Sequence, residues 1–309
     1  MAAMAASRNA ACNIITDSCC DLPQGYLEEN GVAVLHFSYV GALGPDDVSP
    51  RLDDMFASWG PHEFYGAMRE GAQPMTSQPS QAEFESVFRT AVESGVPSVY
   101  LSLSSGISGC YEGALAALGR LKEELGEDVP LRVVDTKVGS TGLALLVVEA
   151  IRRRDAGCTA DELAAWAESA HDRISVSFMV DDLNALSRGG RIPAGAAAVG
   201  TFLDVKPLLS FAPDGKLSMI GVARGRKKGM RRLVDIFAKC HAAGDCGDVV
   251  TLGNADCPDD LRVLEEMLRA EAERQGTSPE FVQTNIGPTI GCHVGPGMIS
   301  CVFWGEARG

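Results

Sequence analysis

The sequence predicts an α/β protein with an N-terminal parallel sheet carrying helices on both faces, followed by a second α/β domain with a mixed sheet. Three observations lead to this prediction. Short apolar runs alternate with amphipathic helical patterns through the first half, which is the rhythm of a parallel sheet. Residues 205–223 have a hairpin pattern, which requires antiparallel neighbours in the second half. At about 150 residues per domain, a chain of 309 residues predicts two domains, 1–157 and 158–309.

The first half is expected to contain strands at four short apolar runs. These runs are residues 13–16, 32–40, 98–103 and 131–134. A helix is predicted over residues 81–94, because Phe84 and Phe88 begin an apolar stripe with helical spacing. Ser80 and Glu83 form a capping box before this helix, and Gly95 provides its stop signal.

The second half begins with a helix whose capping box is Thr159 and Glu162. Residues 174–178 alternate strictly between apolar and polar, which predicts a half-buried strand. The turn Pro213-Asp214-Gly215 separates the two strands of the hairpin. Two further helices, carried by Leu233 and Leu264 with their apolar neighbours, and a last strand at 298–304 complete the mixed sheet.

The charge of the chain limits what it can bind. Its 27 Lys and Arg against 41 Asp and Glu give a formal net charge of −14. A field of that sign repels phosphate backbones and anionic lipid surfaces, so we expect no nucleic-acid partner. The longest apolar segment, 142–150, contains Glu149 and predicts no membrane span. The first eleven residues do not resemble a signal peptide, and the expected location is therefore cytoplasmic.

The ten cysteines are expected to be reduced thiols rather than a disulfide scaffold. There is no C-x-x-C, and Cys19-Cys20 is too close for an ordinary bridge. A zinc site is a weaker alternative. Its ligands would be Cys240, His241, Cys246 and Cys257.

The segment 103–111 is the most informative one for function. It leaves a predicted strand, turns on Gly106 and Gly109, and enters a helix with Ser108 at the expected N-cap. A helix N-terminus offers unpaired N–H groups and favours an anionic oxygen. One alternative is that Ser108 only caps its own helix. Another is the nucleophile elbow of serine hydrolases, G-x-S-x-G, although Cys110 replaces its second glycine.

Three other segments stand out. Residues 75–80 form a hydroxyl-rich turn before the first helix, which is also explained as a cap with a proline-set turn. Residues 290–297 place His293 in a glycine-rich loop, where the backbone must approach something closely. Two basic elements, 187–192 and 224–232, interrupt the acidic background, and the second one is also explained as a solvated helix face.

Together these segments resemble the DegV family in type and order, from about residue 13 to residue 304. The matching segments are Ile15-Thr16-Asp17-Ser18, Asp21-Leu22-Pro23, Thr76-Ser77-Gln78-Pro79-Ser80, Ser104-Ser105-Gly106-Ile107-Ser108-Gly109, Val134-Asp135-Thr136-Lys137, 186–192, Lys206-Pro207, 222–228 and His293-x-Gly295-Pro296-Gly297. The resemblance implies a bacterial two-domain α/β protein that holds one long-chain fatty acid such as palmitate, stearate or oleate. The second domain would form much of the acyl tunnel.

The resemblance also implies site residues and a partner. The fatty-acid carboxylate would meet Thr76 and Ser108. The other ligand-binding residues implied are Ser77, Ser105, Gly106, Arg191 and His293. Arg224 and Arg226 would contact a fatty acid kinase, which makes an acyl phosphate for phospholipid synthesis. The sequence departs from the family at Cys19-Cys20, Cys110 and Cys292, of which the last two are expected to flank the head-group site.

Physical chemistry favours a carrier over an enzyme. Each buried methylene contributes about 0.8 kcal/mol, so chain burial dominates affinity and the head group needs only to be oriented. We therefore expect no catalytic residue, cofactor or metal, and a monomer that presents its ligand to the kinase. The alternative is a serine acyl hydrolase that uses Ser108 with His293 and Asp135.

Overall fold

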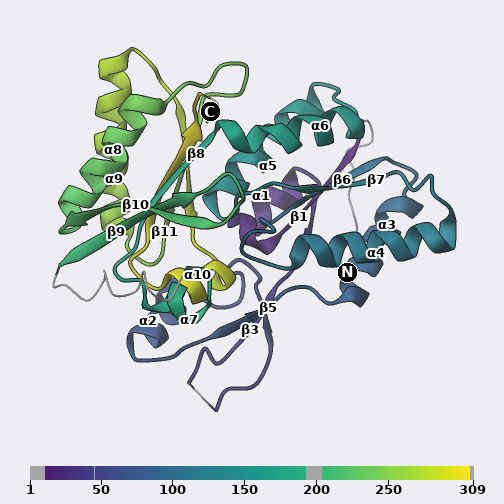
Figure 1. The fold of residues 1–309 in the computed structure, drawn as a ribbon, viewed down its shortest axis with the longest axis horizontal. Coiled ribbons are helices and arrows are strands. Elements are labelled where there is room, and N and C mark those ends of the chain that lie inside the picture. Colours follow the sequence, from purple (N-terminus) through teal and green to yellow (C-terminus); the bar gives the residue numbers. More distant parts are fainter. Residues whose placement is uncertain (1–10, 45, 193–203, 307–309) are drawn as a thin grey trace.

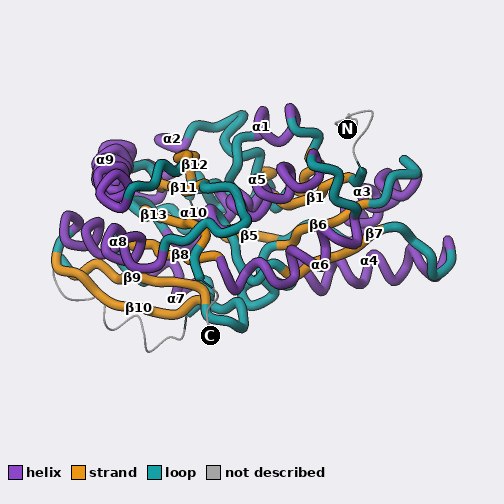
Figure 2. Tube along the Cα trace, turned by 90° about the horizontal axis from the view of Figure 1, so that it is seen from above, coloured by secondary structure: helices purple, strands orange, loops and turns teal. Residues whose placement is uncertain are grey.

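The computed structural model describes residues 11–44, 46–192 and 204–306, and it contains two main sheets side by side (Figures 1 and 2). The first is a four-stranded parallel sheet in the order β2-β1-β6-β7. Its strands are β1 (Asn13–Asp17), β2 (Val32–Leu35), β6 (Ser98–Ser102) and β7 (Leu131–Asp135). The predicted parallel sheet is therefore confirmed. The first ten residues, on which the signal-peptide expectation rests, lie outside the described ranges.

Helices cover both faces of the parallel sheet, as predicted. α3 (Gln81–Glu93) and α4 (Cys110–Leu125) pack on one face, while α5 (Thr141–Asp155) and α6 (Ala160–Ala170) lie on the other. The capping boxes at Ser80 and Thr159 both form. Between β1 and β2 the chain forms η1 (Ser18–Cys20) and α1 (Gln24–Glu29).

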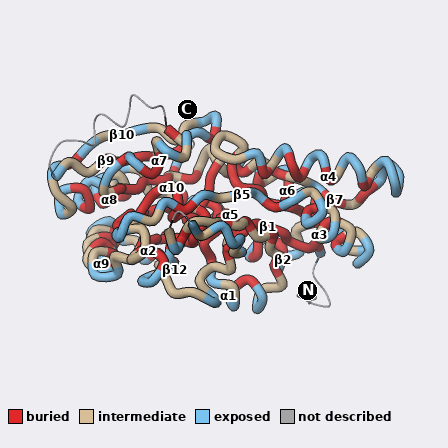
Figure 3. The backbone as a smooth tube through the Cα atoms, turned by 90° about the horizontal axis from the view of Figure 1, so that it is seen from below, coloured by how far each residue is buried: buried red, intermediate tan, exposed pale blue. Residues whose placement is uncertain are grey.

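The second sheet is mixed and has the order β10-β9-β8-β13-β11-β12, in which only β11 and β12 pair in parallel. Its strands are β8 (Ile174–Met179), β9 (Val205–Phe211), β10 (Leu217–Arg224), β11 (Val249–Asn254), β12 (Glu280–Asn285) and β13 (Ile299–Trp304). α8 (Arg226–Cys240) and α9 (Pro258–Gln275) cover one face, and α5 covers the other. Figure 3 shows buried residues continuing from one sheet through α5 to the other.

A third, small antiparallel sheet and three short helices lie near the junction of the two main sheets. The strands, in the order β4-β3-β5, are β3 (Ser38–Val40), β4 (Arg51–Leu52) and β5 (Met75–Ser77). The helices are α2 (Pro61–Arg69), α7 (Asn184–Arg188) and α10 (Pro288–Val294). The remaining element, η2 (His171–Arg173), leads from α6 into β8.

The structure corrects three local predictions. Residues 32–40 form two strands in two sheets, because the chain turns away at Phe37, whose N–H donates to Ser18 Oγ at 3.1 Å. β8 is covered on both faces instead of being half-buried, since α5 and α8 pack on opposite sides of its sheet. The predicted glycine-rich loop around His293 is the helix α10. The predicted domain boundary at residue 157 stays a prediction. α6 follows this residue in the chain, but it packs on β6 and β7 of the first sheet.

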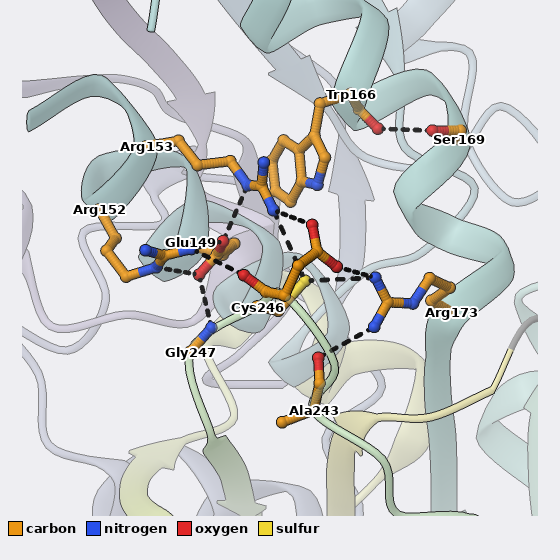
Figure 4. A network of polar contacts seen from close by, with 10 residues as sticks. Glu149, Arg152, Arg153, Trp166, Ser169, Arg173, Ala243, Cys246 and Gly247 are labelled. Carbon is orange, nitrogen blue, oxygen red and sulfur yellow. Dashed lines mark hydrogen bonds and ion pairs between the residues drawn. The ribbon is translucent and has the colours of Figure 1, made fainter. Parts of the chain in front are cut away.

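A polar network ties the C-terminal end of α5 to the second half of the chain (Figure 4). The buried Glu149 carboxylate accepts bonds from Arg152 and Arg153 and from the Gly247 N–H at 3.0 Å. Arg153 and Arg173 both pair with Asp245, whose pKa these bonds lower to about 2. Because α5 lies between the two main sheets, this network helps to hold them together.

No helix within the described ranges combines the length and the apolar character that crossing a membrane requires. All ten cysteines are free. The alternative zinc site does not form, since no three His, Cys, Asp or Glu residues of the described chain gather around a common point.

Candidate functional site

A cavity lies where the two main sheets, the small sheet and α10 meet. It has about 660 Å³ of space not filled by atoms, including its open mouth. Most of its wall is apolar. The apolar residues include Phe37, Leu103, Phe178, Phe211, Ile290 and Met298. An apolar molecule is therefore the kind of ligand that this wall favours.

Four polar side chains predicted for the site line the same cavity. Thr76 comes from β5, Ser108 from the turn before α4, Arg191 from the turn after α7, and His293 from the last turn of α10. The fold thus brings together residues that are far apart in the chain. They give the cavity hydroxyl donors, an imidazole and one positive charge.

Thr76 and His293 contact each other directly, with 2.9 Å between Thr76 Oγ1 and His293 Nε2. Burial, together with the positive charge of Arg191, lowers the pKa of His293 to about 4, so the ring is neutral at pH 7. His293 Nδ1 is buried and has no partner in the described part of the chain. A neutral ring with its proton on Nε2 would donate it to Thr76 and leave the Thr76 hydroxyl proton for a ligand.

Gly189 and Arg191 complete this end of the cavity. A Cβ at position 189 would overlap His293 Nδ1, so only glycine lets the imidazole lie there. The Arg191 guanidinium donates to the carbonyl oxygens of Ile107, at 3.0 Å, and Gly189. Burial lowers the pKa of Arg191 without removing its charge at neutral pH. These bonds hold one positive charge near the Thr76–His293 pair.

Ser108 lies one residue before the position predicted for it. The N-cap of α4 is Gly109, and Ser108 Oγ accepts the N–H of Cys110 at 3.2 Å. Its own hydroxyl proton remains able to donate into the cavity. The start of α4 can therefore still offer hydrogen-bond donors to an anionic oxygen, as expected.

Ser77, Ser105 and Gly106 do not line the cavity. Ser77 follows Thr76 on β5 and is exposed, since neighbouring strand residues point to opposite sides. Ser105 bonds to Asp135 and accepts a bond from Lys137 Nζ at 3.0 Å. These three positions support the site from outside.

Gly106 has a structural reason of its own. A Cβ at this position would overlap the backbone of Gly215 in the turn between β9 and β10. Ser104 Oγ, two residues earlier, donates to the Gly215 carbonyl at 2.8 Å. The glycine therefore allows the loop before α4 to pack against the hairpin of the mixed sheet.

The hydrolase constellation does not form. His293 bonds to Thr76 and not to Ser108, and Asp135 is occupied by Ser105 and by Lys137, 2.6 Å away. A nucleophile, a base and an orienting acid must form one chain of hydrogen bonds, and these residues do not. The geometry therefore does not support the hypothesis of a serine hydrolase that uses Ser108 with His293 and Asp135.

Sequence reasoning missed several polar residues of the cavity wall. They are Ser140, Thr141, Thr289 and Ser300. Ser140 precedes α5 with a φ of 55°, and Gly139 before it leaves no room for a Cβ beside Leu103. The run Gly139-Ser140-Thr141 after a strand was the available signal, because such runs often begin a helix at a binding edge.

The two basic residues predicted for a partner differ in their surroundings. Arg224 is exposed at the end of β10. Arg226 is half-buried, pairs with Asp181 at 3.0 Å and Asp260 at 2.5 Å, and donates to the Gly297 carbonyl. Arg226 thus holds elements of the second half together, and Arg224 is the one free to meet a partner surface.

Comparison with known proteins assigns the chain to a family. The family model described as "Uncharacterised protein, DegV family" matches residues 11–306. The chain belongs to the DegV family. It is 32% identical to the DegV domain-containing protein CPE0026 of Clostridium perfringens, over 96% of this chain and 98% of that protein. The DegV domain-containing protein YteA of Lactococcus lactis is 31% identical, over 93% of this chain and 95% of that one.

Solved DegV structures share the fold. A fatty-acid-binding DegV protein of Thermus thermophilus is 29% identical, with a TM-score of 0.77 over 95% of this chain and 99% of that one. The Fak B3 protein of Streptococcus pneumoniae, loaded with linoleic acid, is 17% identical and has a TM-score of 0.79, with 95% and 99% covered. The two-domain α/β fold expected from the family resemblance is therefore confirmed.

The cysteines by which this chain departs from the DegV pattern stay out of the cavity. Cys110 Sγ lies 3.1 Å from the Tyr100 hydroxyl, and Cys292 is buried in the core that runs through both halves of the chain. Burial raises the pKa of both thiols well above the ordinary value. Neither thiol lines the cavity, and the expectation that both flank the head-group site stays a prediction.

Proposed function

We propose that this chain binds one long-chain fatty acid in the cavity, with the carboxylate at Thr76, Ser108, Arg191 and His293. The observation that carries the proposal is a mostly apolar cavity whose wall also holds the Thr76–His293 pair, Ser108 and Arg191. The fatty-acid-binding DegV protein of Thermus thermophilus and the lipid-binding DegV protein of Thermotoga maritima support it. Palmitate, stearate and oleate are the candidate ligands.

The energetics agree with this assignment of roles. Burying a sixteen-carbon chain gains roughly 12 kcal/mol before the entropic cost of association. A carboxylate that moves into the cavity loses water, and it needs donors to offset that loss. Thr76 and Ser108 each supply a hydroxyl, and the charge of Arg191 favours the ionised form. The head-group residues therefore select the ligand, and the apolar wall supplies most of the affinity.

A matched pair of ligands tests the proposal. Displacement of a fluorescent fatty acid is measured with palmitate and with hexadecanol, which has the same chain and no carboxylate. Palmitate is expected to displace the probe at least tenfold more effectively. Equal potency of the two ligands would remove the head-group assignment. Failure of both to displace or to bind would remove the fatty-acid assignment itself.

We further propose that the protein is a monomeric cytoplasmic carrier, not an enzyme, and that it presents the carboxylate to a fatty acid kinase for acyl-phosphate formation. The kinship with Fak B3, a fatty acid kinase protein by name, supports this step. The exposed Arg224 near the basic helix α8 is suited to an acidic partner surface. Arg226 is not assigned to the partner, because its ion pairs are internal.

The kinase step is tested separately from binding. Arg224→Glu is expected to retain fatty-acid affinity and to lose most kinase-dependent phosphorylation of the bound acid. Lys122→Glu on α4 makes the same change of charge on another element and serves as the control. Equal phosphorylation of the Arg224→Glu, Lys122→Glu and unchanged proteins would contradict the role of Arg224.

A further inference from the structure

Two buried carboxylates hold the first turn of α10, the helix that carries His293. Asp53 Oδ2 accepts the N–H of Thr289 at 2.9 Å, and Asp21 Oδ1 accepts the N–H of Gly287 at 2.9 Å. Asp53 is completely buried and Asp21 is 3% exposed. Backbone N–H groups at the start of a helix have no partner within the helix, so these carboxylates satisfy donors that would otherwise be buried and unpaired.

Asp21 also bonds to a second element of the cavity wall. Its Oδ2 accepts the Ser140 hydroxyl at 2.5 Å, and Ser140 is the residue before α5. Ser140 and Thr289 both line the cavity. One carboxylate thus joins the starts of α5 and α10.

The surroundings of α10 leave it little freedom to shift. A Cβ at Gly287 would lie 2.8 Å from Asp21 Oδ1, and one at Gly291 would lie 2.5 Å from the Tyr65 hydroxyl oxygen. The Tyr65 hydroxyl itself donates to the Ile286 carbonyl at 2.6 Å. Both glycines are therefore required for this close packing. A seven-residue helix has few internal bonds, so these external contacts determine where it lies.

We propose that Asp21 and Asp53 are positioning residues of the head-group site, which hold α10 so that His293 Nε2 reaches Thr76 Oγ1. Neither carboxylate lines the cavity. Each carboxylate holds the backbone of α10 in place. Through the position of His293, it also influences the direction in which the Thr76 hydroxyl donates. The part of the proposal that concerns ligand affinity rests on the proposed fatty-acid function, whereas the part that concerns the Thr76–His293 contact does not.

The chemistry of the two carboxyls is consistent with this role. Burial raises the pKa of both, while the bonds from Gly287, Thr289 and Ser140 act in the opposite direction. The partial positive charge at the start of a helix also favours a carboxylate there. Burying a carboxyl group has a desolvation cost. A role in holding α10 in position explains why these two acids are buried despite that cost.

The experiment compares Asp53→Ala with Asp53→Asn. The Asn side chain keeps an oxygen that can accept the Thr289 N–H, and the Ala side chain does not. The first measurement is the ¹⁵N chemical shifts of His293 in the ligand-free protein, which report whether the proton is on Nε2. The second is palmitate affinity. Glu149→Gln, which changes a buried carboxyl group at the far end of α5, is the matched control.

The unchanged protein, Asp53→Asn and Glu149→Gln are expected to show His293 protonated on Nε2. Asp53→Ala is expected to shift His293 toward a mixture of tautomers and to weaken palmitate binding about tenfold, with Asn restoring it to within about threefold. Adding Thr76→Val to Asp53→Ala should cost little more, because both act on one contact.

Folded Asp53→Ala protein with unchanged His293 shifts would overturn the proposal. Equal effects of Asp53→Ala, Asp53→Asn and Glu149→Gln on those shifts would also overturn it, since they would report general destabilisation. The corresponding change at the second carboxyl group, Asp21→Asn, is expected to preserve the His293 shifts, because its amide oxygen can still accept the Gly287 N–H. If the unchanged protein binds no palmitate, the fatty-acid function fails, while the His293 shifts still decide the positioning role.

Discussion

His293 Nε2 lies 2.9 Å from Thr76 Oγ1, although the two residues are 217 positions apart in the chain. β5 of the small sheet provides the threonine, and α10 beside the mixed sheet provides the histidine. A neutral imidazole that donates from Nε2 leaves the threonine hydroxyl to donate elsewhere. Ser108 and Arg191 face the same space.

Removing the two hydroxyls should weaken fatty-acid binding by similar amounts. Thr76→Val keeps the shape of the side chain, and Ser108→Ala removes one donor. Each should cost about 1–3 kcal/mol of binding free energy, since a carboxylate loses a charge-assisted bond. Isothermal titration calorimetry with palmitate checks this. The double variant should cost less than the sum of the two single variants, because both hydroxyls act on one ligand group. Unaltered affinity in both single variants would place the head group elsewhere.

Gly189→Ala should displace His293 without unfolding the protein. The new Cβ would overlap His293 Nδ1, so the ring must move and its bond to Thr76 must lengthen. We expect palmitate affinity to fall about tenfold, a loss of about 1.4 kcal/mol. Gly119→Ala on α4, where a Cβ meets no neighbour within 4 Å, is the control and should keep full affinity. Equal affinities for the two variants would show that His293 can move without consequence.

The pKa of His293 predicts how stability depends on pH. Burial lowers it to about 4 from 6.5, so between these values the unfolded chain binds a proton that the folded protein does not. Stability therefore falls as pH drops from about 6.5 to about 4. Urea unfolding at pH 7 and pH 4 should show that the unchanged protein loses about 2–4 kcal/mol more than His293→Gln. Identical losses in the two proteins would contradict the neutral, buried state of this ring.

Glu149 should be important for stability and unimportant for the ligand. Glu149→Ala would leave Arg152 and Arg153 without their shared partner and the Gly247 N–H without its acceptor (Figure 4). Arg152 is half-exposed and Arg153 keeps Asp245, so the main cost is the unpaired Gly247 N–H, about 1–3 kcal/mol. Chemical denaturation measures this loss, and the exposed Glu123→Ala on α4 should change stability by less than about 0.5 kcal/mol. Similar values for both variants would show that the network contributes little.

Local patterns in the sequence predicted the regular elements well, because their causes are local. The stripe beginning at Phe84 and the capping boxes at Ser80 and Thr159 depend on residues within a few positions of each other. The break between β2 and β3 was not predictable in this way. The bond from the Phe37 N–H to Ser18 Oγ turns the chain there, and no glycine or proline marks the place.

The candidate site was predictable in part, and only with help from the family resemblance. Thr76, Ser108, Arg191 and His293 line one cavity, as that resemblance led us to expect. The place of His293 on a short helix was missed, because α10 has too few residues to show a helical pattern. The roles of Asp21 and Asp53 were hidden for another reason. Each acts on a backbone group more than 200 positions away, and no local pattern records such a bond.

The central claim is that this cavity holds a long-chain fatty acid. Native mass spectrometry of freshly purified protein tests it most directly, with gentle declustering and with a delipidated sample as reference. The account predicts a population heavier than the bare chain by the mass of one C16–C18 fatty acid, which disappears on delipidation and returns when palmitate is added. A single unliganded mass before and after incubation with palmitate would contradict it.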